Sequence, residues 1–280
     1  RPFDEGACEN GNDEEISLRN ALVILTTSVG EEVFREPSVG FSAARSLDVV
    51  SMPDKAQADV ADGQFDTIGK LQGHFHYAEK KGYSGVGVYT RHEPSDVVVG
   101  FDGGEFDAEG RYVELRFDTP KRRCSIISCY FPSGSSGPER QEAKYRFLDL
   151  IEPHLMGLKK KREFILCGDV NIAHHEVDLK NWRSNQKNSG FLPQERAWMT
   201  QLTTQGGLVD VYRRLHPDAT DACYTWWSNR GQAYANNVGW RLDYHLATPA
   251  LAAQARSESI YKGEKFSDHA PITISYDLRL

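Results

Sequence analysis

The sequence predicts an α/β fold in which two β-sheets pack face to face and helices lie outside them. Short apolar runs that end at Gly, Asp or Pro, as strands do, are grouped between residues 85 and 130 and again between residues 224 and 276. Segments with helical apolar spacing follow the strands. This grouping favours two packed sheets with outer helices. No Pro/Ser/Gly-rich linker divides the 280 residues, so we predict one domain at residues 21–280.

The N-terminal part has weak patterns. Residues 1–20 are polar and acidic, which predicts a disordered tail. Strands are predicted at Ala21–Leu25 and at Leu47–Val50. Four clearer strands, at residues 85–90, 97–100, 112–117 and 124–130, are predicted to form an antiparallel meander.

Two helices are predicted next. The first opens at residues 136–139 with Pro138 at its first position, and Pro153 should kink it. Its apolar stripe is Ala143, Phe147, Leu150, Ile151, Leu155 and Leu158. The second helix follows Pro193, turns Trp198 and Leu202 toward the core and ends before Gly206. The last strands are predicted at residues 224–227, 241–246 and 272–276.

Composition limits the class of protein. The net charge is −7, but residues 1–70 hold 14 acidic and 6 basic side chains, so the remaining residues are nearly neutral and local clustering decides whether phosphates can bind. The five Cys residues are odd in number and form no CxxC pair, which favours a reducing compartment over disulfides or zinc. No apolar run reaches the roughly 18 residues of a membrane span. We therefore expect a cytoplasmic, soluble protein with no membrane partner.

The most informative stretch is Glu163–Ile172, an apolar run that stops at Gly-Asp-x-Asn. It predicts a buried strand, and a spacing of two places Asp169 and Asn171 on the same side of it. A carboxylate beside a carboxamide at a rigid strand end can orient a water molecule and accept its proton. The alternative is a turn or a helix cap.

Three other strand ends carry polar side chains, namely Tyr130, Asp243 and the pair Asp268 and His269. If the strands lie side by side, these groups converge at one rim, where an Asp can fix the tautomer of a His. The alternatives are a turn before Pro271, an ion pair of Asp243 with Arg241, and a core position for Tyr130.

A further segment suits nucleic acid. Residues 178–191, here called the Asn/Lys loop, are rich in amides and bases that can donate to phosphate oxygens, although a solvated loop would look similar. Three of the five Trp residues, Trp226, Trp227 and Trp240, lie within fifteen residues and could form a stacking platform or part of the core.

Together these motifs closely resemble the exonuclease III family of abasic-site DNA endonucleases, within the endonuclease/exonuclease/phosphatase superfamily. The resemblance runs from about Gly73 to Leu278 and rests on residues 129–136, 168–174, 188–191, 237–244 and 267–271. The wider superfamily, with its sphingomyelinases and inositol phosphatases, shares Gly-Asp-x-Asn and Ser-Asp-His. It lacks the Asn/Lys loop and the Trp-rich stretch.

The resemblance implies a four-layer α/β sandwich, two mixed β-sheets flanked by helices. It implies Mg²⁺, with Mn²⁺ as a substitute, and cleavage 5′ to an abasic site in base-excision repair, with 3′-5′ exonuclease or 3′-end trimming activity as an addition. The implied partner is double-stranded DNA with abasic sites or blocked 3′ ends. A monomer is implied, associated with the nucleoid if the source is bacterial.

The resemblance also implies roles. Asp169 would activate the attacking water, Asn171 would hold it or the phosphate, and His269, oriented by Asp243, would stabilise phosphoryl charge with the phenol of Tyr130. Which of Asp169, Tyr130 and His269 accepts the proton stays open. Asp268 would lie at the metal. Trp226, Trp240 and Leu242 would line the pocket for the flipped-out sugar. The residues implied to contact the DNA backbone are Tyr83, Asn181, Asn185, Lys187 and Asn188.

The N-terminal part, to about residue 72, diverges from the family pattern. The family carries a metal-binding Glu at the end of its second strand, where this chain has Asp54 after Pro53, and Ser28 lies near an expected Asn. Asn10 and Asn12 offer another register. Asp54 can replace the Glu if the backbone shifts, since Mg²⁺ needs few protein oxygens. Otherwise the chain is a catalytically weak homologue that binds damaged DNA.

Overall fold

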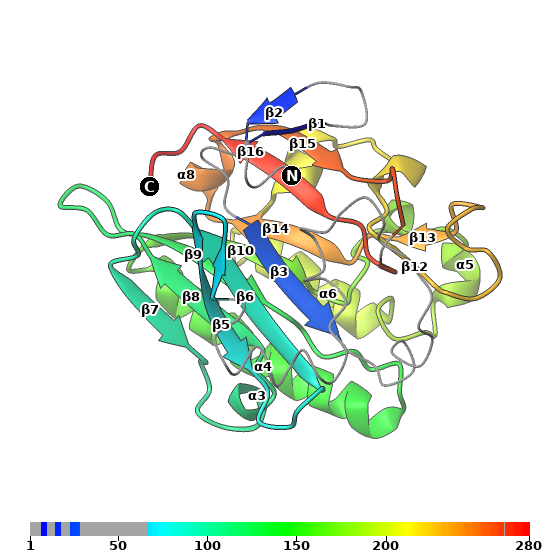
Figure 1. Cartoon of the computed structure of the whole chain (residues 1–280). Helices are drawn as coiled ribbons and strands as arrows, with labels where there is room; N and C mark the ends of the chain where they lie inside the picture. Colours follow the sequence, from blue (N-terminus) through cyan, green and yellow to red (C-terminus); the bar gives the residue numbers. More distant parts are fainter. Residues whose placement is uncertain (1–6, 10–14, 18–22, 29–65, 266) are drawn as a thin grey trace.

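The computed structural model describes residues 7–9, 15–17, 23–28, 66–265 and 267–280. Two large sheets lie against each other, and the longest helices cover the larger one (Figure 1). The predicted α/β class with two packed sheets and flanking helices is confirmed. The predicted second strand, Leu47–Val50, and Asp54 lie outside the described residues.

The described strands are β1 (Ala7–Glu9), β2 (Glu15–Ser17), β3 (Val23–Ser28), β4 (Thr67–Ile68), β5 (Leu71–Tyr77), β6 (Ser84–Thr90), β7 (Asp96–Val99), β8 (Tyr112–Arg116), β9 (Cys124–Cys129), β10 (Glu163–Asp169), β11 (Val209–Asp210), β12 (Trp226–Trp227), β13 (Gly239–Trp240), β14 (Asp243–Ala247), β15 (Ala255–Ile260) and β16 (Ile272–Tyr276). The described helices are α3 (Glu105–Ala108), α4 (Pro138–Lys159), α5 (Trp182–Asn185), α6 (Pro193–Thr204), α7 (Val211–Leu215) and α8 (Pro249–Ala252), with 3₁₀ turns η1 (Glu176–Asp178) and η2 (Asp221–Cys223).

The larger sheet has six strands in the order β11-β14-β10-β9-β8-β7. It is mixed, because β9 and β10 run parallel while the other neighbours are antiparallel. The parallel pair needs a long crossover, which α4 provides. This connection delivers β10, with Asp169 at its end, to the middle of the sheet.

The second sheet has the order β3-β6-β5-β4, and its described pairings are antiparallel. The predicted four-strand meander is therefore wrong in one member. Strands β7, β8 and β9 form a meander, but β6 pairs with β3 and β5 in the other sheet. The pattern of β6 fits either place, because all seven of its residues are buried.

The middle of strand β10, Phe164–Cys167, is apolar because both of its faces are covered. Ile165 and Cys167 point into the core between the sheets, with Val86 and Val88 of β6. Phe164 and Leu166 point the other way, into the core beneath α4 and α6. The alternation expected of a central strand is thus satisfied on two apolar sides.

Helix α4 matches the predicted stripe except at one position. Ala143, Phe147, Ile151, Leu155 and Leu158 are buried, but Leu150 is 45% exposed. Residue 150 lies roughly 100° around the helix from the buried Ile151, on the side away from Leu148 and Leu155, and so falls at the edge of the stripe. The helix is assigned without a break across Pro153. In α6, Trp198 and Leu202 are buried as predicted.

Several predicted boundaries shift. The first strand, β3, covers Val23–Ser28, and β12 holds only the two Trp residues of the predicted segment 224–227. Strand β14 starts at Asp243, so the residue before it, Leu242, lies in the entering loop. Within residues 1–20, β1 and β2 form a short antiparallel ladder. Strands β5 and β15 were not predicted.

A tight turn fixes the place where α3 meets the second sheet. Gly110 has a φ of +64°, and a Cβ there would lie 2.4 Å from the backbone nitrogen of Ala78 and 2.5 Å from the carbonyl carbon of Tyr77. This close approach holds Glu109 beside Tyr83, whose hydroxyl donates to Glu109 Oε1 at 3.1 Å. The close approach of Gly110 to the backbone of residues 77 and 78 therefore helps to hold Tyr83, which is a predicted DNA contact.

We predict that Gly110→Ala destabilises the protein far more than Gly103→Ala. Both glycines have left-handed φ angles, but a Cβ at Gly103 meets no atom within 4 Å. Left-handed strain costs about 1–2 kcal/mol at either site, and overpacking against backbone should add about 1–3 kcal/mol at Gly110. Denaturant unfolding of both variants measures the difference. Equal losses would show that the contact with Ala78 relaxes freely.

Candidate active site

The centre of the site is a pair of carboxylates on adjacent strands. Asp169 ends β10, Asp243 begins β14, and the two residues are directly opposite in the antiparallel register. Their exposed fractions are 4% and 8%. Burial, followed by the charge of Asp243, raises the pKa of Asp169. A buried carboxyl group with a raised pKa is a common feature of catalytic sites.

His269 lies between the two carboxylates. Its Nδ1 is 2.9 Å from Asp243 Oδ2, and its Nε2 is 3.9 Å from Asp169 Oδ2. Burial opposes protonation, but the charge and hydrogen bond of Asp243 prevail and raise the pKa of His269. The predicted Asp243–His269 pair is therefore formed, as an imidazolium held beside Asp169.

Thr225 holds the segments that bring these groups together. Its buried hydroxyl accepts hydrogen bonds from the backbone N–H groups of Leu242 and Asp243, both at 3.1 Å. Its carbonyl accepts from the backbone N–H of Ala270 at 2.7 Å, one residue after His269. Thr225 thus links the start of β14 to the segment before β16. No motif in the sequence marks Thr225 as a site residue.

Asn171 is beside Asp169, as predicted, but for a different reason. Strand β10 ends at Asp169, and Asn171 has a left-handed φ of 56°, so strand alternation does not place it. Its Nδ2 donates to Asp169 Oδ2 at 2.8 Å and to Phe131 O at 3.0 Å. Both amide hydrogens are used, which fixes the direction of the carboxamide oxygen.

Tyr130 lies at the same rim. The backbone N–H of the next residue, Phe131, donates to Asp169 O at 2.9 Å. The guanidinium of Arg111 lies 4.8 Å from the centre of the Tyr130 ring and donates to its carbonyl. Tyr130 also packs against the core between the sheets, so the core position considered from sequence is partly realised.

Asp268 is the described candidate for a metal ligand. Its Oδ2 accepts from the indole of Trp226 at 3.1 Å, and its Oδ1 has a distant donor, Ser267 Oγ, at 3.4 Å. Carboxylate oxygens suit a hard divalent cation. Within the described ranges, no three His, Cys, Asp or Glu side chains gather as ligands. The donor type therefore fits Mg²⁺, while the described residues supply only part of a ligand set.

Trp226, Trp240 and Leu242 are brought together as predicted. The two indoles meet edge to face at 6.3 Å across the β12–β13 ladder. They pack with Trp182 around the buried side chains Ala173, Leu179, Phe191 and Leu242. Trp227 points away into another core. The predicted Trp cluster thus divides into a partly exposed apolar wall and one core residue.

The Asn/Lys loop is more ordered than a solvated connector. It contains α5, and Asn181 precedes this helix with a φ of 56°. Asn185 Nδ2 donates to Asn181 O at 3.0 Å, and Asn188 Nδ2 donates to Asn185 Oδ1 at 2.7 Å. Lys187 is exposed. Tyr83 lies between β5 and β6 of the second sheet, and its ring is near the cations Lys80, Arg111 and Arg140.

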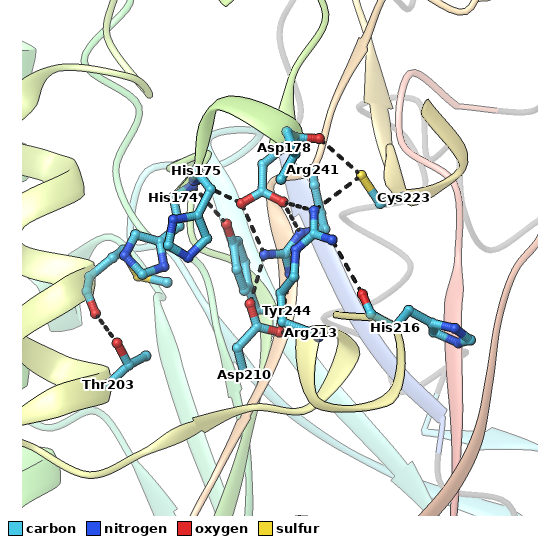
Figure 2. A network of polar contacts seen from close by, with 12 residues as sticks. His174, His175, Asp178, Thr203, Asp210, Arg213, His216, Cys223, Arg241 and Tyr244 are labelled. Atoms are coloured by element: carbon cyan, nitrogen blue, oxygen red, sulfur yellow. Dashed lines mark hydrogen bonds and ion pairs between the residues drawn. The ribbon is translucent and has the colours of Figure 1, made fainter. Parts of the chain in front are cut away.

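A buried ionic network lies beneath this loop (Figure 2). Arg241 is fully buried and bonds to Asp178 Oδ1 at 2.8 Å and to Asp210 at 2.7 Å, while Arg213 donates to the same oxygen of Asp178. Despite burial, these arginines hold the pKa of Asp178 well below its usual range. The backbone N–H of Arg241 also donates to Asp178 O at 2.7 Å. The network joins the loop to the start of β14.

Two further buried ions were missed from sequence. Lys144 of α4 and Glu195 of α6 form an ion pair with no exposed side-chain surface. Lys144 stands three and four residues before the buried Phe147 and Leu148, so its position on the apolar face of α4 was a usable signal. For Glu195 the signal was a Glu at the third position after Leu192, a common helix-start pattern.

A sandwich of two sheets with carboxylates, a carboxamide and an imidazolium at one rim defines a hydrolytic α/β enzyme. The sequence model of the Endonuclease/Exonuclease/phosphatase family matches residues 35–269, and the chain belongs to this family. Among the described residues, no helix is both long enough and apolar enough to cross a membrane.

Several relatives are named as DNA nucleases. The chain is 35% identical over 239 residues to an exodeoxyribonuclease of Bacillus subtilis (strain 168), covering 82% of this chain and 92% of that protein. It is 38% identical over 196 residues to DNA repair nuclease APEX1 of Danio rerio, covering 70% of this chain and 61% of that protein. The structure of an AP endonuclease from Archaeoglobus fulgidus aligns with a TM-score of 0.66 and 25% identity, covering 81% of this chain and 84% of that one. The resemblance to the exonuclease III family is confirmed.

We predict that Arg241→Met destabilises the protein by about 3–5 kcal/mol, because Asp178 and Asp210 lose a buried cation. The control is Arg256→Met, whose partner Asp277 is exposed and whose loss should cost less than about 1 kcal/mol. Denaturant unfolding compares the two variants. A loss at Arg241 as small as that at Arg256 would mean that water or rearrangement compensates the two carboxylates.

Proposed function

We propose that the protein is an Mg²⁺-dependent endonuclease that cuts the DNA backbone 5′ to an abasic site. The observation that carries this proposal is the arrangement of Asp169, Asn171, His269 and Asp243 at one rim, beside the Trp226–Trp240 wall. The family and the repair nucleases among the relatives support it. Double-stranded DNA is the proposed partner of a monomer.

The proposed reaction is a hydrolysis at phosphorus. Asp169 accepts a proton from water, the water oxygen bonds to phosphorus, and the bond to the 3′ oxygen of the preceding nucleotide breaks. The leaving 3′ oxygen takes a proton from solvent water, so the products are a 3′-hydroxyl and a 5′-phosphate on the abasic residue. The amide hydrogens of Asn171 are taken by Asp169 and Phe131, so its carboxamide oxygen would hold the water. The imidazolium of His269 stabilises the charge on the phosphoryl group. The phenol of Tyr130 would help His269 to stabilise this charge.

Asp268 would hold the cation, together with Asp54 as a proposed second ligand. A divalent cation bound there would neutralise charge that develops on the phosphate. The carboxylate of Asp268 also accepts a hydrogen bond from the indole of Trp226, which links the proposed metal ligand to the apolar wall.

The apolar wall would select the lesion. A flipped-out abasic sugar has no base and can lie against Trp226, Trp240 and Leu242, whereas a normal nucleotide brings a base that the site must also house. The Asn/Lys loop, through Asn181, Asn185, Lys187 and Asn188, and Tyr83 on the other side would hold the flanking phosphates. The exodeoxyribonuclease relative favours a second activity, trimming of 3′ ends, at the same site.

We predict that the protein cuts a duplex with one abasic site when Mg²⁺ is present and not when a chelator is added, leaving a 3′-hydroxyl. Asp169→Asn should lower the rate by about 10²–10⁴-fold, because the proton acceptor is lost. Mapping both product ends by gel electrophoresis tests the position of the cut. Asp277→Asn, at an exposed residue of the C-terminal segment, serves as the control.

Tight binding of the abasic duplex without cutting would contradict the endonuclease and identify a module that binds damaged DNA. Recovery of cutting in Asp54→Glu would then locate the defect at the metal site. Faster turnover of inositol phosphates than of abasic DNA would assign a different substrate class.

We predict that Lys187→Ala weakens binding to abasic duplexes of different sequence by a similar factor, because a phosphate contact carries no base information. The slope of log K against log salt should fall by about 0.9, the value for one phosphate. Lys161→Ala removes the same charge at an exposed position near the opposite end of β10 and is the control. Equal slopes in the two variants would exclude Lys187 from the interface.

A further inference from the structure

The side chains of the Lys144–Glu195 ion pair bond to the backbone of the proposed active site. Lys144 Nζ lies 2.6 Å from Glu195 Oε1, and both side chains are 0% exposed. The pair lies between α4 and α6, on the helical side of the larger sheet. Neither residue belongs to the set that would meet substrate, so their charges need another explanation.

Lys144 holds the peptide of Asn171. Its Nζ donates to Asn171 O at 2.7 Å. Asn171 is in the left-handed region, where its peptide has no strand or helix partners to fix it. With its Nδ2 committed to Asp169 and Phe131, the residue is restrained at both its side chain and its carbonyl.

Glu195 holds the other end of the same segment. Its Oε2 accepts from the backbone N–H groups of Gly190 and Leu192 at 2.7 and 2.9 Å. Gly190 O in turn accepts from the backbone N–H of Ala173 at 2.8 Å. A Cβ on Gly190 would lie 3.1 Å from Asn171 O, so the two ends of segment 171–190 are in direct contact.

The continuous path therefore runs from Asn171 O through Lys144 and Glu195 to Gly190. Burying two charges is costly, and an apolar replacement of similar volume is often at least as stable. Here each ion carries a second hydrogen bond to the backbone of the segment, which an apolar pair would lose. The ion pair is less stabilising than an apolar pair could be, but it fixes the backbone geometry at the base of the Asn/Lys loop.

We propose that Lys144 and Glu195 are a positioning pair that sets Asn171 in register with the Asn/Lys loop. When the loop grips phosphates on either side of the lesion, the pair fixes where the carboxamide oxygen of Asn171 holds the water that attacks the phosphate. The inference rests on the proposed function and adds to it two residues that act through Asn171 without touching DNA.

The test is the double variant Lys144→Met/Glu195→Gln, which removes both charges together and leaves an oxygen that can accept from Gly190. Displacement of a reacting group by a fraction of an ångström should slow single-turnover cutting at saturating protein by roughly tenfold to a hundredfold. The dissociation constant for the abasic duplex should change much less. Lys159→Met is the matched control, because this lysine of the same helix also donates to a backbone carbonyl, Gly206 O at 2.7 Å.

A merely structural role predicts a different result. Loss of folded protein lowers the amplitude of the single turnover and leaves its rate constant unchanged, and that outcome would overturn the proposal. In an Asn171→Ala background the double variant should add little further loss, because the pair acts through Asn171. Fully additive losses would also overturn it.

Amide exchange gives a readout that needs no activity. Peptides within residues 171–191 should exchange faster in the double variant and not in Lys159→Met. If the parent protein cuts no abasic DNA, the proposed function fails, and unchanged exchange would separately reject the positioning pair. Should the double variant not fold, Glu195→Gln alone keeps the acceptor for Gly190 and should show a smaller loss in the same direction.

Discussion

The site depends on the register between β10 and β14, which sets Asp169 directly opposite Asp243. Opposite residues of an antiparallel pair are about 4.5–5.5 Å apart at Cα, so two buried carboxylates there repel unless a cation compensates them. His269 supplies that charge, bonded to one carboxylate and near the other. A shift of register by one residue would turn one carboxylate to the other face of the sheet. His269 would then face one negative charge in place of two.

Buried ions maintain this arrangement where the backbone is irregular. Asn171 and the segment entering β14 lie outside helices and strands, so their backbone groups have no ladder partners. Side chains and other backbone groups replace them: the N–H of Leu242 donates to Thr225 Oγ1, and that of Arg241 donates to Asp178 O. Arg241, two residues before Asp243, is clamped by Asp178 and Asp210, and Lys144 bonds to the carbonyl of Asn171. On both sides of the carboxylate pair, an irregular segment is thus held by charges that never reach the surface.

The sequence predicted the rim correctly where a strand end or a motif marked it, as at Asp169 and His269. It placed Asn171 correctly for the wrong reason, because a left-handed residue next to a strand has no periodic pattern. It assigned β6 to the wrong meander, because a strand buried on both faces fits either sheet. Lys144 and Glu195 each had a local signal in the sequence, but they are far apart in the chain, and only the packing of α4 against α6 shows that they pair. The roles of the predicted site residues stay proposals.

An overall charge of −7 raises the question of how such a chain would bind a polyanion. Charges act over about 8 Å at physiological salt, so distant acidic residues matter little to a phosphate at the site. The buried cations Arg241 and Lys144 are matched by carboxylates and add little field outside. On the proposed function, affinity then comes from a few placed donors on the Asn/Lys loop and beside Tyr83. Such donors bind phosphates well only if the loop that carries them is held in place. The buried ions at the two ends of the Asn/Lys loop hold it there.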